Sequence, residues 1–270
     1  MEQKNDFLGT ESIGKLLWKM SVPAIAAQLI NLLYNLVDRI YIGHMPGDGA
    51  LALTGVGVCM PIIMIVTAFA ALVSNGGAPR ASMAMGKGDY DEAEKILGNS
   101  FALQIIISVL LTVLLLLFHR PLLLMFGASE NTISYAASYM GIYALGTIFV
   151  QLTLGMNAFI TAQGFAKTGM LSVLIGAVCN IILDPILIYG FHMGVRGAAV
   201  AIIVSQAVST VWGIRFLTGK KTVLKIRRQN LKLESKVVMP GLALGLAPFI
   251  MQASESVIIV CFNSSLLKYG

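Results

Sequence analysis

Long apolar stretches separated by short polar segments make up most of this 270-residue chain. A helix needs about 20 apolar residues to cross the hydrocarbon core of a bilayer. Seven stretches reach that length, so the pattern predicts an all-α membrane protein with seven spans. The predicted spans cover residues 20–44, 51–74, 96–118, 137–160 (within the longer apolar stretch 133–166), 168–191, 197–217 and 237–267.

The composition agrees with this pattern. Hydrophobic residues make up 57% of the chain and charged residues 12%, whereas soluble domains carry about 25% charged residues. Residues 1–10 are polar and no cleavage pattern follows the first apolar run, so we expect no cleavable signal peptide. Cys59, Cys179 and Cys261 lie far apart in apolar runs, which predicts core thiols and neither a disulfide framework nor a zinc site.

The basic residues are distributed unevenly between the two predicted sides of the membrane. If the N-terminus is cytoplasmic, only Arg120, Arg196 and Lys268 of the 19 Lys and Arg residues fall in outside segments, and Arg39 lies within a span. This bias predicts a multi-pass protein of the cytoplasmic membrane with its N-terminus inside. The net charge of +6 therefore follows topology, and we expect no nucleic-acid partner.

The densest basic segment is residues 218–236. Such a run either fixes the topology as a cytoplasmic linker between two halves or binds anionic membrane lipid. We favour the linker.

The first span carries a polar stripe. Its members follow one another at intervals of three, four and three residues, which places all four on one helical face: Gln28, Asn31, Asn35 and Asp38. Exposing amides and a carboxylate to lipid is costly, so this face should meet other helices or a cavity. A stripe that only joins helices by hydrogen bonds is the alternative, but a carboxylate at its end favours a cavity lining.

Asp38 lies about 27 Å along a helix that begins at residue 20. Position alone therefore leaves a second interpretation open, in which Asp38 and Arg39 mark the end of the span. Arg39 is not an obvious partner for Asp38, because adjacent residues do not share a helix face.

The fifth span contains Asn180 and Asp184, which are four residues apart and share a face. Asp184 lies about 22 Å from the start of the span, with further apolar residues beyond it. A charge at membrane depth costs about 2.5–3.5 kcal/mol even on a mild insertion scale, so such a group is a functional-site candidate. Pro185 removes a backbone donor and should distort the helix, which leaves carbonyl oxygens near the carboxylate.

The first and fifth spans run in the same direction, so Asp38 and Asp184 should lie at similar depth and can share a site. Burial and mutual repulsion both favour a protonated carboxyl, which could load and release a proton as access alternates. Carboxylate and carbonyl oxygens are equally suitable ligands for Na⁺, a hard cation. The sequence therefore predicts a proton or Na⁺ site at Asp38, Asn180 and Asp184.

Several segments resemble the multidrug and toxic compound extrusion (MATE) transporters of the MOP superfamily. The matches occur in family order and cover nearly the whole chain. They are PAIAAQLINLLYNLVDRIYIGH (23–44), ALTGVGVCMPI (52–62), GKGDYDEAEKILG (86–98), NAFITAQG (157–164) and NIILDPILIYGFHMGVRGAAVAIIVSQ (180–206).

The resemblance implies a cation-coupled antiporter that exports amphipathic, often cationic drugs, with H⁺ or Na⁺ as coupling ion and no other cofactor. It also implies a six-helix N-lobe around a central cavity. Asp38, Asn180 and Asp184 match the cation or proton site of that lobe in the family.

Three further positions also match the family. Tyr139 and Asn157 match residues that line the same lobe in some members. Pro23 matches the proline at which the first helix is proposed to bend, although it could instead simply start the helix.

The chain departs from the family in length, because family members have two six-helix lobes related by a repeat. Residues 1–217 would form the N-lobe, 218–236 the linker and 237–270 the first span of a truncated C-lobe. The resemblance therefore implies either a missing C-lobe as partner or a fragment that does not transport.

The seventh span shows a weak repeat of the first. Pro248 can be aligned with Pro23, which places Gln252 near the position of Gln28. Asn263 then falls at the position of Asp38.

Glu255 lies in the same span and matches either a coupling acid of some members or a salt-paired structural acid. Gln252 and Glu255 are therefore candidates for a second-lobe site.

Other functions fit less well. A lipid-linked oligosaccharide flippase would need several basic residues for pyrophosphate, but only Arg39 lies within a span. A seven-helix photoreceptor would need a lysine in its last span, and a receptor normally has its N-terminus outside. The chain has no phosphate-binding glycine loop and its three histidines lie at span ends, so we expect no catalytic residues and no enzyme. Small-molecule drugs and membrane lipids are the expected partners.

Overall fold

The computed structural model describes residues 11–269, without the side chains of Ser264 and of residues 266–269. The polar first ten residues and the side chain of Lys268 lie outside this part. Seven long helices occupy it: α2 (Ile13–Gly43), α3 (Gly49–Gly86), α4 (Tyr90–Met125), α5 (Ile133–Ala162), α6 (Ala166–Pro185), α7 (Val195–Leu217) and α8 (Ser235–Tyr269). A short π-helix η1 (Ile186–Gly190) extends α6, and a 3₁₀ turn η2 (Arg228–Leu231) lies before α8.

Each predicted span corresponds to a helix that is long and apolar enough to cross a membrane. Large apolar side chains such as Leu32, Leu117 and Phe191 are mostly exposed on the outer surface of the bundle, where lipid would cover them. The prediction of an all-α, multi-pass membrane protein is therefore confirmed.

The turn between α3 and α4 lies beyond the predicted apolar limits, because both helices continue into polar sequence. The carboxylate of Asp89 caps α4 by accepting from the backbone N–H of Glu92 at 3.0 Å. Asp91 and Glu92 place negative charge in the first turn, which the helix dipole favours. Gly88 adopts a φ of 79°, which glycine accepts without steric cost.

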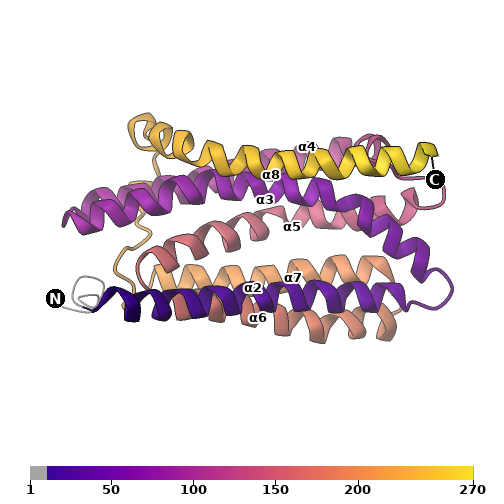
Figure 1. Cartoon of the computed structure of the whole chain (residues 1–270), viewed down its shortest axis with the longest axis horizontal. Coiled ribbons are helices and arrows are strands. Elements are labelled where there is room, and N and C mark those ends of the chain that lie inside the picture. The colour runs from indigo at the N-terminus through magenta and orange to yellow at the C-terminus, as the bar shows by residue number, and fades with distance from the viewer. Residues whose placement is uncertain (1–10, 270) are drawn as a thin grey trace.

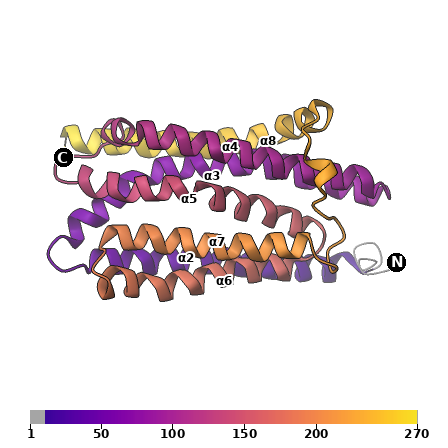
Figure 2. The same cartoon turned by 180° about the vertical axis from the view of Figure 1, so that it is seen from behind.

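The helices form two groups on either side of α5. Figures 1 and 2 show α3, α4 and α8 on one side and α2, α6 and α7 on the other. The start of α2 and the linker from α7 to α8 lie at one end of the bundle, here called the N-terminal end. The α2–α3, α4–α5 and α6–α7 loops lie at the opposite end, here called the far end.

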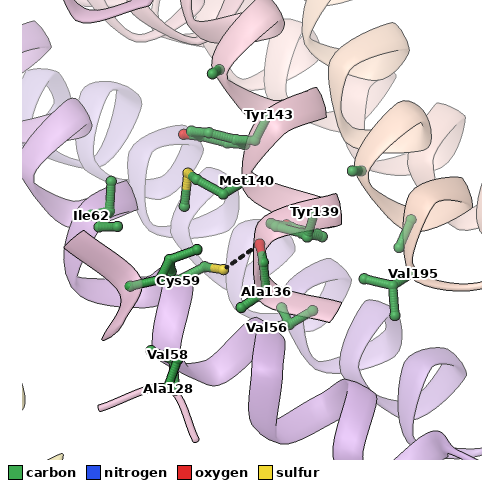
Figure 3. Packing of buried hydrophobic residues seen from close by; sticks show 14 of the residues in the cluster. Val56, Val58, Cys59, Ile62, Ala128, Ala136, Tyr139, Met140, Tyr143 and Val195 are labelled. Atoms are coloured by element: carbon green, nitrogen blue, oxygen red, sulfur yellow. Dashed lines mark hydrogen bonds between the residues drawn. The ribbon is translucent and has the colours of Figure 1, made fainter. Parts of the chain in front are cut away.

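One hydrophobic cluster lies in the far half of the bundle, where residues of α3 and α5 pack with residues of α2, α4, η1 and α7; Figure 3 shows part of it. Within it, the buried thiol of Cys59 donates to the carbonyl of Ala136 at 3.5 Å. Cys179 is half-buried and Cys261 is exposed, and all three thiols are free. The prediction of a core thiol is therefore wrong for Cys261, because that face of α8 points away from α3.

Candidate functional site

The predicted carboxyl pair lies at the contact between α2 and α6, which pack against each other. Asp38 on α2 is 5% exposed and Asp184 on α6 is fully buried. Their carboxyl groups are close enough to interact directly. Asn180 is 1% exposed and its amide nitrogen donates to Asp184 Oδ1 at 3.2 Å. The structure thus brings together the three residues predicted to share a site.

Three oxygens in this group lack a hydrogen-bond partner among the described residues. They are Asp38 Oδ1, Asn180 Oδ1 and Asp184 Oδ2. Buried polar atoms are seldom left unpaired, because removing them from water without a partner is costly. A proton shared by the two carboxyl groups would satisfy part of this need. A hard cation would satisfy it as well, since it prefers carboxylate and amide oxygens.

The helix changes from α to π directly after Pro185, the residue that follows Asp184. Pro185 has no N–H to donate to Ile181, so regular α-helical bonding cannot continue, and η1 follows directly. Single π-helical turns often occur at functional sites. The hydroxyl of Tyr189 in η1 donates to the carbonyl of Tyr41 at 2.6 Å. This bond ties the end of α2 to the segment that follows Asp184.

A cavity of about 240 Å³ adjoins Asp38 and is bounded by five helices, α2, α3, α5, α6 and α7. The residues predicted from the sequence that line it are Asn31, Asn35, Asp38, Tyr139 and Asn157. Asn180 and Asp184 are not among the residues that line it. Of the three site residues, Asp38 is therefore the one in contact with the cavity.

A larger cavity of about 670 Å³ lies toward the N-terminal end. Gln28 and Pro23 line it, and it shares Asn31 and Asn157 with the smaller cavity. The polar stripe of α2 therefore follows two adjoining cavities up to Asp38.

Pro23 lies within α2, which begins at Ile13. The interpretation that Pro23 simply starts the helix is therefore wrong. Residues 13–19 are more polar than the predicted span, but they belong to the same helix.

Sequence reasoning missed the wall formed by α5 and α7. Thr153, Ser205, Gln206 and Ser209 line the smaller cavity. Thr153 donates to the carbonyl of Gln206 at 3.0 Å, and Gln206 Oε1 is buried without a hydrogen-bond partner among the described residues. Ser205 and Ser209 are four residues apart in the sixth span, so the spacing that identified the stripe of α2 would also have indicated this face.

The candidate second-lobe residues lie apart from this site. Gln252 is half-buried and Glu255 is exposed on α8, a helix that packs mainly against α3. Within the described part of the chain, Glu255 forms no ion pair. The structure therefore does not bring either residue to Asp38 and Asp184.

A buried carboxyl pair beside a cavity, within a bundle of membrane-spanning helices, is typical of ion-coupled membrane transporters. The sequence profile of the MatE family matches residues 23–186, which include Asp38, Asn180 and Asp184. The chain therefore belongs to the MatE family.

Relatives of known function match almost the entire chain. The multidrug export protein MepA of Staphylococcus haemolyticus (strain JCSC1435) is 27% identical over 96% of this chain and 57% of its own length. MepA of Staphylococcus saprophyticus subsp. saprophyticus is 24% identical over the same shares. The chain thus spans a little over half the length of these relatives.

Solved structures of transporters have the same fold. The outward-facing conformation of a multidrug resistance MATE family transporter of the MOP superfamily superposes with a TM-score of 0.87 and 26% identity, over 95% of this chain and 56% of that one. The inward-facing conformation of such a transporter superposes with a TM-score of 0.79 and 27% identity, over 88% of this chain and 55% of that one.

Proposed function

We propose that this chain forms one lobe, with the first helix of a second lobe, of an antiporter that exports amphipathic and often cationic drugs in exchange for H⁺ or Na⁺. The observation that carries the proposal is the set of three buried, unpartnered oxygens of Asp38, Asn180 and Asp184 beside a cavity. Membership of the MatE family and the names of the relatives support the substrate class.

The geometry supports a mechanism in which coupling ion and drug compete through charge. An ionised Asp38 at the cavity wall attracts a cationic drug, and the low dielectric of the bundle strengthens that attraction. Binding of a proton or Na⁺ by the pair neutralises the carboxylate and weakens the hold on the drug. Exchange follows if the cavity opens to opposite sides in the two loading states.

From the distribution of Lys and Arg, we infer that the protein lies in the cytoplasmic membrane with its N-terminus in the cytoplasm. The linker and the larger cavity then lie toward the cytoplasm, and the carboxyl pair lies toward the outside. Alternating access needs an opposing bundle, so we expect the remaining helices of the second lobe as partner. Without them, the chain would not transport.

The alternative of a lipid-linked oligosaccharide flippase is not favoured. Such a protein needs basic residues to bind pyrophosphate, and the residues that line the two cavities include neither Lys nor Arg.

A bacterial strain without its own drug exporters would test the proposal, with the protein expressed at its natural length. We expect a higher minimum inhibitory concentration for cationic dyes, and dye uptake into inside-out membrane vesicles when a Na⁺ or proton gradient is imposed. The gradient that drives uptake identifies the coupling ion. Protein present in the membrane with neither resistance nor ion-driven uptake would contradict the proposal.

A further inference from the structure

The linker between α7 and α8 is fixed to the helix bundle by buried polar side chains. The first is Gln163, at the end of α5 and fully buried. Its Oε1 accepts from Thr222 Oγ1 at 2.8 Å, from the N–H of Val223 at 3.1 Å and from the N–H of Leu224 at 2.8 Å. One amide oxygen thus holds three successive residues of the linker.

Glu94, in the second turn of α4 and 6% exposed, holds the next part. Its Oε1 accepts from the N–H of Lys225 at 3.2 Å, and its Oε2 pairs with Arg227. Leu224 beside them is fully buried in a hydrophobic cluster at the N-terminal end of the bundle. The middle of the linker is therefore anchored by both a carboxylate and an apolar side chain.

Asn99, five residues further along α4 and 1% exposed, holds the end of the linker. Its amide nitrogen donates to the carbonyl of Asn230 at 3.2 Å, and its Oδ1 accepts from the N–H of Glu234 at 2.7 Å. A Cβ at Gly98 would lie 2.6 Å from the carbonyl oxygen of Asn230, so glycine permits this approach. The last anchor is thus one residue before α8 begins at Ser235.

Beyond the linker, α8 runs antiparallel to α3, and the contacts between them keep one register. As residue numbers fall along α3, they rise by nearly the same steps along α8. The contacting pairs are Arg80 with Val237, Gly76 with Gly241, Leu72 with Gly245, Phe69 with Phe249, and Pro61 with Ser256.

Glycines make this register specific. A Cβ at Gly76 would overlap the backbone of Gly241, and a Cβ at Gly245 would overlap the backbone of Leu72. Small residues allow close helix contact and good van der Waals packing in membranes. A shift by one turn, about 5.4 Å along the axis, would replace a glycine in one of these contacts, because it brings either Phe249 against Leu72 or Val237 against Gly76.

We propose that Glu94, Asn99 and Gln163 are positioning residues that fix the linker and thereby set the register of α8 on α3. Because these side chains fix the linker to the bundle, they set the position at which α8 begins, independently of the glycine contacts with α3. Gln252 and Glu255 take their depth from the same register. The consequence for export rests on the proposed function, whereas the register itself does not.

Cysteine cross-linking in membranes tests the register. The protein is expressed at its natural length with Cys59, Cys179 and Cys261 replaced by Ala. Phe69→Cys with Phe249→Cys reports the observed register, since the two rings are 5.0 Å apart between centroids. Phe69→Cys with Ala253→Cys reports a shift of one turn. We expect the first pair to cross-link in preference when the anchors are intact.

Releasing the anchors should change this preference. We expect Glu94→Ala with Asn99→Ala to lower the ratio of in-register to shifted cross-links by about fivefold, the scale of losing one or two net hydrogen bonds. Glu94→Gln keeps an acceptor for Lys225 and loses the charge pair, so its effect should be smaller. The control changes Arg228 and Lys232, exposed cations of the same linker, to Ala and should leave the ratio unchanged.

Trypsin digestion of inside-out vesicles provides a second measurement. Release of the anchors should speed cleavage after Lys225 and Arg227 by about tenfold, because cleavage follows the population of the open segment. An unchanged cleavage rate would overturn the proposal, and so would faster cleavage with an unchanged cross-link ratio. Neither measurement depends on drug export, so failure of the proposed function would leave the result interpretable.

Discussion

Two helix contacts on opposite sides of α5 are built in different ways (Figure 2). The contact of α2 with α6 centres on Asp38 and Asp184, whose buried oxygens are partly unpartnered. The contact of α3 with α8 relies on Gly76, Gly241 and Gly245, where backbones touch. The first contact can change its charge, while the second can change only by separating or sliding. The ionisable contact therefore lies on one side of the bundle and the close-packed glycine contact on the other.

The division follows from the environment of each contact. Unsatisfied polar groups in a low-dielectric interior are costly, so the α2–α6 contact is not optimised for stability. Glycine contacts gain from close packing and carry no charge. Substitutions at the two contacts should consequently affect different measurements.

The largest expected effect is on transport from Asp184→Asn in the protein at its natural length. We expect drug resistance to fall to the background level, because the amide cannot take up or release the coupling proton and binds a cation weakly. Minimum inhibitory concentrations, with membrane levels measured on immunoblots, provide the test. Glu130→Gln changes an exposed carboxylate and is the matched control. Undiminished resistance in Asp184→Asn would remove Asp184 from the coupling role.

The opposite contact should respond in stability. Gly76→Leu forces a large side chain into the backbone of Gly241, and we expect a loss of about 2–4 kcal/mol, typical of severe overpacking. Thermal unfolding in detergent, followed by size-exclusion chromatography, measures the loss. Gly57→Leu, on the open side of α3 where a Cβ would meet nothing within 4 Å, is the control. Equal melting temperatures for the two variants would show that the glycine contact is not tight.

Asn180→Ala tests the polar contact between α2 and α6. It removes the amide that donates to Asp184 and one of the unpartnered oxygens. We expect the apparent affinity for the coupling ion to fall about tenfold, the usual scale for lost ligand support. Export rate against ion concentration in vesicles measures it. Gln28→Ala in the larger cavity should leave this affinity unchanged, and an equal loss in both variants would argue against a specific role for Asn180.

The smallest expected effect concerns a single bond in the α3–α8 contact. The hydroxyl of Ser256 donates to the carbonyl of Pro61 at 2.9 Å. Ser256→Ala should lower stability by about 0.5–1.5 kcal/mol, the net value of one hydrogen bond, as seen in thermal unfolding. The exposed neighbour Ser254, changed to Ala, should have no measurable effect. A larger loss from Ser254→Ala than from Ser256→Ala would mean that the face of α8 that carries Ser254 packs against α3.

The length and the polar face of a single helix can be predicted from the sequence, whereas most contacts between helices cannot. The stripe from Gln28 to Asp38 and the equal depth of Asp184 follow from helical rise and direction, and the structure places these residues together. The exposure of Cys261 was missed, because an apolar run gives no sign of which face meets another helix. The wall of Ser205 and Ser209 was overlooked although its spacing was present in the sequence.

The sequence by itself determined which face of α2 is polar and that residues 11–269 form seven helices long and apolar enough to span a membrane. The length of an apolar run against the bilayer thickness, and a period of 3.6 residues, are local properties. Only the tertiary structure decided that α6 meets this face, that α8 lies on α3 in one register, and that Glu94, Asn99 and Gln163 hold the linker. These contacts join residues far apart in the chain, and the free energy of each depends on the surface that the partner helix presents.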